Sequence, residues 1–251
     1  LAEVLITLGI IGVVAALTMP SVINNVQKIV LKNQFKTAYS IISNAISRAS
    51  YDLGYVPACH GWVQSRHNPT CSQKNEAGAC VAYTTSDGEP LPSDTWGDTS
   101  ECNIFWPQFK KSLSVVKDCN KNALSNGCIP NYKGIDQINQ ESYNKKPGEE
   151  GYIDNYGELL TVGACGGYKK KDIDGSSAFV LNNGIIIFNY SGYKMDIDVN
   201  GKKGPNKWGY DLYSIRLDNE ANGPIKILRS ECTTVEKGGI SGTSMIQNIS
   251  K

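Results

Sequence analysis

The sequence predicts an α+β fold in which a long N-terminal helix stalk, 1–53, packs against a C-terminal antiparallel β-sheet head with disulfide-rich loops. Three observations support this prediction. A helical pattern fills the beginning of the chain, apolar strand-like runs gather near its end, and eight cysteines all lie outside the helical part. Because 251 residues can form a sizeable core, we expect two parts, the helix 1–53 and a globular head at 54–251.

The first seventeen residues are almost wholly apolar and contain a single charge, at Glu3. This length is close to the ~20 apolar residues that cross a bilayer as a helix. A carboxylate in hydrocarbon costs roughly 2.5 to 3.5 kcal/mol, so we expect a cationic group opposite Glu3. No basic segment precedes the run and no small-residue cleavage pattern follows it. We therefore expect it to belong to the mature protein.

The helical pattern continues beyond Pro20 as an amphipathic stretch. Apolar residues recur there at intervals of three and four, while lysines occupy the other positions. The pattern runs to about Asp52, before Gly54 and Pro57 end it. This part of the helix should pack under the head.

The head begins with an irregular region, 59–151, which we expect disulfides to hold together more than a large core does. Within it, 104–116 has aromatic and aliphatic residues at near-helical spacing. Strand signals come later. Two apolar runs flank an Asn-Gly turn and predict a hairpin. The expected strands are 178–181, 185–188, 194–199, 211–217 and 225–228, in a sheet of about four strands.

The even number of cysteines indicates disulfides formed in an oxidising compartment. They are Cys59, Cys71, Cys80, Cys102, Cys119, Cys128, Cys165 and Cys232. We expect Cys119 to pair with Cys128, because the turn-rich residues between them can close a short loop. Cys165 with Cys232 is a second expected pair, and the remaining pairings are left open.

Zinc is an alternative to disulfides at Cys59, His60, His67 and Cys71, which lie in a short window. Their spacing matches no standard zinc motif, and the adjacent Cys59 and His60 make poor joint ligands. We therefore prefer disulfides at these cysteines.

A second metal question concerns the stretch 196–211. It begins like a calcium loop, with Asp196, Asp198 and Asn200 at alternate positions, but its twelfth residue is Lys207, where an EF-hand has glutamate. A turn at Asn200-Gly201 explains the glycine without any metal. We expect no cofactor, and calcium at these three oxygen-bearing residues stays as the alternative.

The N-terminal residues resemble those of a known family. Leu1-Ala2-Glu3-Val4-Leu5-Ile6, Gly9-Ile10-Ile11-Gly12 and Pro20 are similar to the methylation motif of type IV pilins and type II secretion pseudopilins. In that family a prepilin peptidase removes a basic leader, and the new N-terminus is methylated. Two residues normally precede the leucine matched by Leu1, so the chain departs from the motif there.

The resemblance assigns assembly roles to Glu3, Gly9, Gly12 and Pro20. It implies that Glu3 pairs with the amino terminus of a neighbouring subunit. Glycine and proline weaken a helix by roughly 1 and 3 kcal/mol, and the family often unwinds before the proline. We therefore expect a kink or unwinding between about Ala15 and Pro20.

The function that the resemblance implies is that of a major pilin, a structural subunit. Such a subunit polymerises through its hydrophobic N-terminal helix into an extracellular filament on the bacterial cell surface, and lies in the inner membrane before assembly. Its partners would be other copies of itself, the prepilin peptidase and the pilus assembly machinery. The alternative is a minor pilin or pseudopilin of a type II secretion or competence system, with an adhesive role as one form of it.

Other classes of protein lack support in the sequence. A net charge of +1 without a basic stripe gives no reason to expect nucleic-acid binding. The chain has only two histidines, and no Gly-x-Ser-x-Gly, P-loop or dinucleotide fingerprint occurs. We therefore expect that the protein is not an enzyme.

Overall fold

The structure is a computed structural model. It describes residues 2–57, 59, 69–74, 80–91, 101–138, 165, 167–192, 194–219, 225–230, 232 and 234–249. The helices are α1 (Ala2–Leu53), α2 (Cys102–Lys111), α5 (Lys170–Gly175), the 3-10 helix η1 (Gly201–Lys203) and α6 (Gly242–Gln247). The strands are β1 (Thr70–Lys74), β2 (Cys80–Thr84), β3 (Val115–Cys119), β4 (Ala178–Leu181), β5 (Ile186–Ser191), β6 (Lys194–Asp198), β7 (Leu212–Asn219) and β8 (Ile225–Arg229).

A six-stranded antiparallel sheet lies at the centre of the head, in the order β3-β4-β5-β6-β7-β8. Every strand of this sheet pairs with the next one along the chain, as in a meander. The register places Ile187 opposite Ile197, and Ile197 opposite Tyr213, across the central strands. β1 and β2 form a separate two-stranded hairpin.

The two faces of the six-stranded sheet support two separate cores. Successive residues of a strand point to opposite faces, so neighbours in the sequence enter different cores. Ile187 joins the core beneath α1, whereas Ile186 and Phe188 join the second core. The second core includes Tyr132 and Trp208, which come from loops. Both faces of the sheet are therefore covered.

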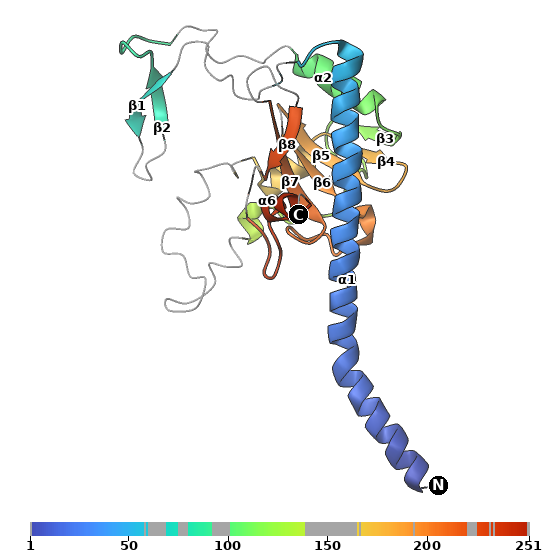
Figure 1. Cartoon of the computed structure of the whole chain (residues 1–251). Helices are drawn as coiled ribbons and strands as arrows, with labels where there is room; N and C mark the ends of the chain where they lie inside the picture. The colour runs from blue at the N-terminus through green and yellow to red at the C-terminus, as the bar shows by residue number, and fades with distance from the viewer. Residues whose placement is uncertain are drawn as a thin grey trace.

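α1 packs on the head only along its C-terminal half. Its buried residues recur every three or four positions and thus form one stripe, as in an amphipathic helix. They are Leu31, Phe35, Ala38, Ile42, Ala45, Ile46 and Ala49. This half contacts α2 and β8, whereas the N-terminal half projects beyond the head (Figure 1). Among the described residues, no helix combines the length and the apolar character needed to cross a membrane.

The predicted fold class, a helical stalk against a sheet of about four strands, is wrong. The sheet has six strands, and only the part of α1 that begins at Leu31 packs against the head. β3 was missed because it is an edge strand whose residues are mostly exposed, so no buried apolar run marks it. α2 ends at Lys111, and β3 begins at Val115, within the last residues of the segment 104–116.

Of the kink or unwinding expected between about Ala15 and Pro20, the unwinding is absent, whereas Figure 1 shows that α1 bends in the part below the head. α1 is a single helix from Ala2 to Leu53, and Figure 1 shows it curving without a break. The helix penalties of the glycines and the proline therefore do not interrupt α1.

The stripe on α1 leads to a first prediction. Ile42→Ala should lower the free energy of unfolding by about 2 to 5 kcal/mol, because Ile42 is fully buried and its removal leaves a cavity. Ile23→Ala is the matched control on the same helix, since Ile23 is 52% exposed, and it should change stability by less than about 0.5 kcal/mol. Urea unfolding with the disulfides intact measures both. Equal effects would contradict the packing described here.

Candidate assembly surface

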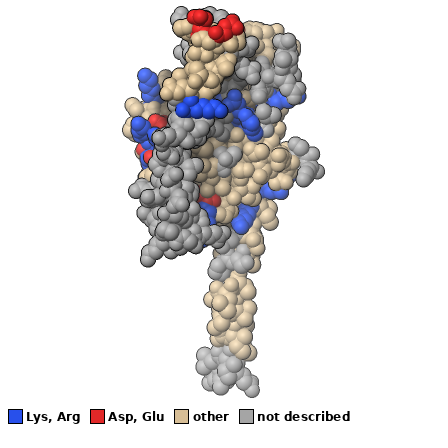
Figure 2. Space-filling view, turned by 90° about the vertical axis from the view of Figure 1, so that its left-hand side faces the viewer, with Lys and Arg blue, Asp and Glu red and all other residues tan. Residues whose placement is uncertain are grey.

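The N-terminal half of α1 presents a continuous apolar surface. Twelve large apolar side chains between Leu8 and Val30 are 47 to 76% exposed. The sequence has no charged residue between Glu3 and Lys28. Figure 2 shows the described part of this stem below the head as a column without charged side chains. Contiguous apolar surface of this kind marks a site of contact with another protein or with lipid.

The assembly residues expected from the sequence all lie in this half of α1. Gly9 and Gly12 lie in the exposed part, and a Cβ atom added at either would meet nothing within 4 Å. They are therefore not required by packing inside the subunit, and they leave room for another helix to approach closely. The backbones of Glu3 and Pro20 belong to α1. Their side chains lie outside the described residues.

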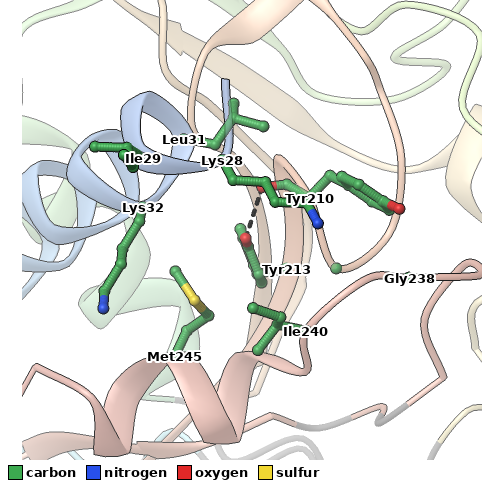
Figure 3. Close-up of a pocket in the computed structure, with 10 residues that line it drawn as sticks. Lys28, Ile29, Leu31, Lys32, Tyr210, Tyr213, Gly238, Ile240 and Met245 are labelled. Atoms are coloured by element: carbon green, nitrogen blue, oxygen red, sulfur yellow. Dashed lines mark hydrogen bonds between the residues drawn. The ribbon is translucent and has the colours of Figure 1, made fainter. Parts of the chain in front are cut away.

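A pocket of about 200 Å³ lies where α1 meets the head (Figure 3). One wall is a single turn of α1, 28–32. The opposite wall comes from the turn before β7, 209–210, and from the C-terminal segment, 238–245. The residues that line the pocket are Lys28, Ile29, Leu31, Lys32, Gly209, Tyr210, Tyr213, Gly238, Ile240 and Met245.

Tyr213 forms the floor of this pocket and is held from two sides. Its ring packs edge-on against Phe35 of α1, with ring centroids 4.6 Å apart. Its hydroxyl donates a hydrogen bond of 2.6 Å to the backbone oxygen of Tyr210. Burial, and then the charge of Asp211, raise the pKa of Tyr213, so the hydroxyl remains a donor at physiological pH. The pocket wall is thus preformed.

Glycines allow the backbone to pass close to its neighbours around the pocket. Gly209 has φ +84, and a Cβ there would lie 2.8 Å from Val235. Gly238 has φ +81, and a Cβ there would lie 2.7 Å from the hydroxyl of Tyr210. Larger residues at these two positions would force the loops apart. No local motif in the sequence marks this pocket.

Two of the residues considered for calcium, Asp196 and Asp198, accept hydrogen bonds from other protein groups. Asp198 is fully buried and accepts hydrogen bonds from the Tyr132 hydroxyl at 2.6 Å and from the amides of Asn200 and Gly201. Asp196 accepts from the side-chain amide of Asn189 at 2.8 Å. Within the described ranges, no group of three or more His, Cys, Asp or Glu residues could hold a metal ion. The loop geometry therefore has a structural explanation in these contacts.

Asp211 is a second buried carboxylate near this loop, and it accepts from the amides of Asn206 and Lys207, both at 2.7 Å. Burial raises the pKa of Asp198 to about 7, and the negative charge of Asp211 adds to the rise, although the Tyr132 hydroxyl and two loop amides oppose it. Burial also raises the pKa of Asp211. Both carboxyl groups of this pair therefore have raised pKa values.

The expected disulfides are present. Cys119 pairs with Cys128, and Cys165 pairs with Cys232. Cys59 pairs with Cys102, which ties the segment after α1 to the start of α2. Cys71 is disulfide-bonded as well.

The zinc alternative is wrong, because Cys59 and Cys71 are both oxidised and a disulfide sulfur cannot act as a thiolate ligand. His60 and His67 lie outside the described residues.

Comparisons with protein-family models, with curated proteins and with solved structures found no match to this chain.

The perturbed pKa of Asp198 leads to a second prediction. The folded state binds a proton that the unfolded state releases, so the stability due to this group is fully present below pH 3.8 and is lost as the pH rises to about 7. The free energy of unfolding should therefore fall over this interval, and Asp198→Asn should flatten the fall.

Urea unfolding at a series of pH values, with a chelator present, tests this prediction. Asp87→Asn is the control, because Asp87 is exposed, and it should keep the fall in stability. An Asp198→Asn protein with the same pH dependence as the wild type would contradict the prediction.

Proposed function

We propose that this protein is a structural subunit that polymerises through the N-terminal half of α1 into an extracellular filament similar to a type IV pilus. The observation that supports the proposal is the exposed apolar surface between Leu8 and Val30, which has no partner in the described head and no charge to keep it in water. A single subunit would leave this surface hydrated at a large cost in free energy.

Bundling the helices would remove that cost. Burying one large aliphatic side chain contributes about 1.5 to 3 kcal/mol, and the surface has twelve such side chains. Open positions at Gly9 and Gly12 would let neighbouring helices pack closely. A repeated contact between two different surfaces of the same chain produces an open helix when the rotation between copies does not close a ring. The head would then lie on the outside of the filament.

The disulfides are consistent with this location. Three disulfide bonds in the described part of the chain indicate a non-reducing environment, such as the outside of a bacterial cell. In the proposal, the prepilin peptidase and the assembly machinery process the chain and drive polymerisation. The charge of Glu3 is neutralised by a cation on a neighbouring subunit, because an unpaired carboxylate inside a helical bundle is costly.

A second candidate function is that of a minor pilin or pseudopilin with an adhesive role. Exposed aromatic residues at and just after the C-terminal end of α1 favour it, since Tyr51 is 85% and Tyr55 is 46% exposed. Aromatic side chains supply large contact areas at a low entropy cost in recognition surfaces. Copy number separates the two candidates, because a major subunit builds the whole fibre and a minor one occurs in few copies.

The test is electron cryo-microscopy of filaments sheared from the native cell surface, with the subunit identified from its side chains. If this chain repeats along the fibre with its α1 helices bundled in the centre, the major-subunit proposal is supported. If other chains form the fibre and this one is confined to a tip, the minor-subunit proposal is supported. If the chain does not occur in any filament, both proposals are wrong.

A point substitution provides a third prediction. Ile11→Asp should abolish polymerisation, because it places a charge in the middle of the apolar surface, where Ile11 is 64% exposed. The head should unfold at the same urea concentration as in the wild type, since Ile11 lies outside its core. Pelleting of polymer by ultracentrifugation measures the first effect, and circular dichroism measures the second.

Val116→Asp is the matched control for this substitution. Val116 is 65% exposed, but it lies on β3 and outside the apolar surface of α1. The Val116→Asp variant should polymerise as the wild type does. Loss of polymer in both variants would indicate a general effect of exposed charge and would contradict the role given to α1.

A further inference from the structure

We infer that the pocket between α1 and the C-terminal segment receives the N-terminal end of α1 from a second copy of the chain, with Glu3 of that copy meeting Lys28 and Lys32. The inference rests on the proposed function and adds the two surfaces that meet. It also assigns Glu3 a partner among the residues of this chain.

The lining of the pocket fits an apolar helix end. Ile29 and Leu31 line the pocket from α1, and Ile240 and Met245 line it from the C-terminal segment, with Tyr213 drawn between the two elements in Figure 3. Ile240 is 48% exposed, so an apolar side chain entering the pocket would cover surface that is now in contact with water. Covering this surface would stabilise the contact, because removing apolar area from water is favourable.

The charges at the pocket complement those of the helix end. Lys28 and Lys32 are one helical turn apart and exposed, and neither forms an ion pair with another described residue. Glu3 is the only charged residue in the first 27. A helix end with one negative charge therefore meets a pocket whose charged lining residues are both positive. Pairing opposite charges also opposes incorrect registers, because like charges brought together are costly.

The contact has to form between copies rather than within one. α1 is continuous from Ala2 to Leu53, so Glu3 is held about 38 Å along the helix from Lys28 at 1.5 Å per residue. The helix end cannot fold back into its own pocket. The pocket and the helix end are different surfaces of the same chain, so each copy can offer its helix end to the next, and the series stays open when the rotation between copies does not close a ring.

The test uses charge reversal in the full chain. Two variants are made, Glu3→Lys alone and Lys28→Glu combined with Lys32→Glu. Each is purified in detergent, and polymer is pelleted after detergent removal. Each variant alone should form at least about tenfold less polymer than the wild type, because every contact then joins like charges. Urea unfolding of the head should be unchanged in both, since Lys28 and Lys32 are exposed.

Mixing the two variants in equal amounts provides the decisive result. In the mixture, the positively charged helix end of the Glu3→Lys variant meets the negatively charged pocket of the double variant. The unchanged Glu3 of the double variant meets the unchanged lysines in the pocket of the first. Polymer should therefore return to near the wild-type amount, with alternating copies. Lys36→Glu is the control, because it reverses an exposed charge on α1 outside the pocket, and it should polymerise normally.

Three results would overturn the inference. The first is normal polymer from the variant with both Lys28→Glu and Lys32→Glu, while Glu3→Lys alone fails to polymerise. This result would assign Glu3 to another cation, such as the amino terminus. The second is no recovery in the mixture. The third is that the variant with both Lys28→Glu and Lys32→Glu polymerises normally but no longer binds vesicles of anionic phospholipid. This result would assign the pocket to contact with a membrane surface. If the wild-type chain itself forms no polymer, the proposed function fails together with the inference.

Discussion

The burial of one stripe of α1 against the six-stranded sheet is the interaction on which the other features of the structure depend. Phe35, Ile42 and Ile46 are almost completely buried and share one core with residues of the sheet and of α2. They fix where the helix lies and therefore where its exposed half leaves the head. The same packing positions Phe35 against Tyr213, which closes the floor of the pocket. A change in the stripe would thus disturb the head core and the pocket together.

The second face of the sheet depends on loops rather than on a long helix, and polar contacts hold those loops in place. Asp198 accepts hydrogen bonds from the Tyr132 hydroxyl and from the amides of the turn at Asn200 and Gly201. Asp211 accepts hydrogen bonds from the backbone amides of Asn206 and Lys207. Disulfides add covalent restraints, because they limit the conformations of the unfolded chain. Buried acids and disulfides thus add to the apolar contacts of the second core.

The two halves of α1 obey the same physical rule with opposite results. An apolar stripe on one side of a helix is satisfied by a single sheet, as it is after Leu31. An apolar surface on all sides cannot be covered by one partner in the same subunit, so several neighbours are needed. This difference is the physical basis of the proposed filament. The pocket lies at the boundary between the two halves, where Lys28 and Lys32 are the first charged residues after Glu3.

The sequence by itself determined those features that depend on neighbouring residues. The Asn-Gly turn predicted β4 and the start of β5 within one residue, and the spacing of apolar residues predicted which half of α1 is buried. Tertiary structure alone decided the remaining features. β3 forms because β4 offers it a partner, and Asp198 is satisfied because Tyr132 approaches from 66 residues away in the sequence. The pocket joins Lys28 to Met245. Local periodicity records which side of an element is apolar, but contacts between distant residues depend on what the fold places opposite.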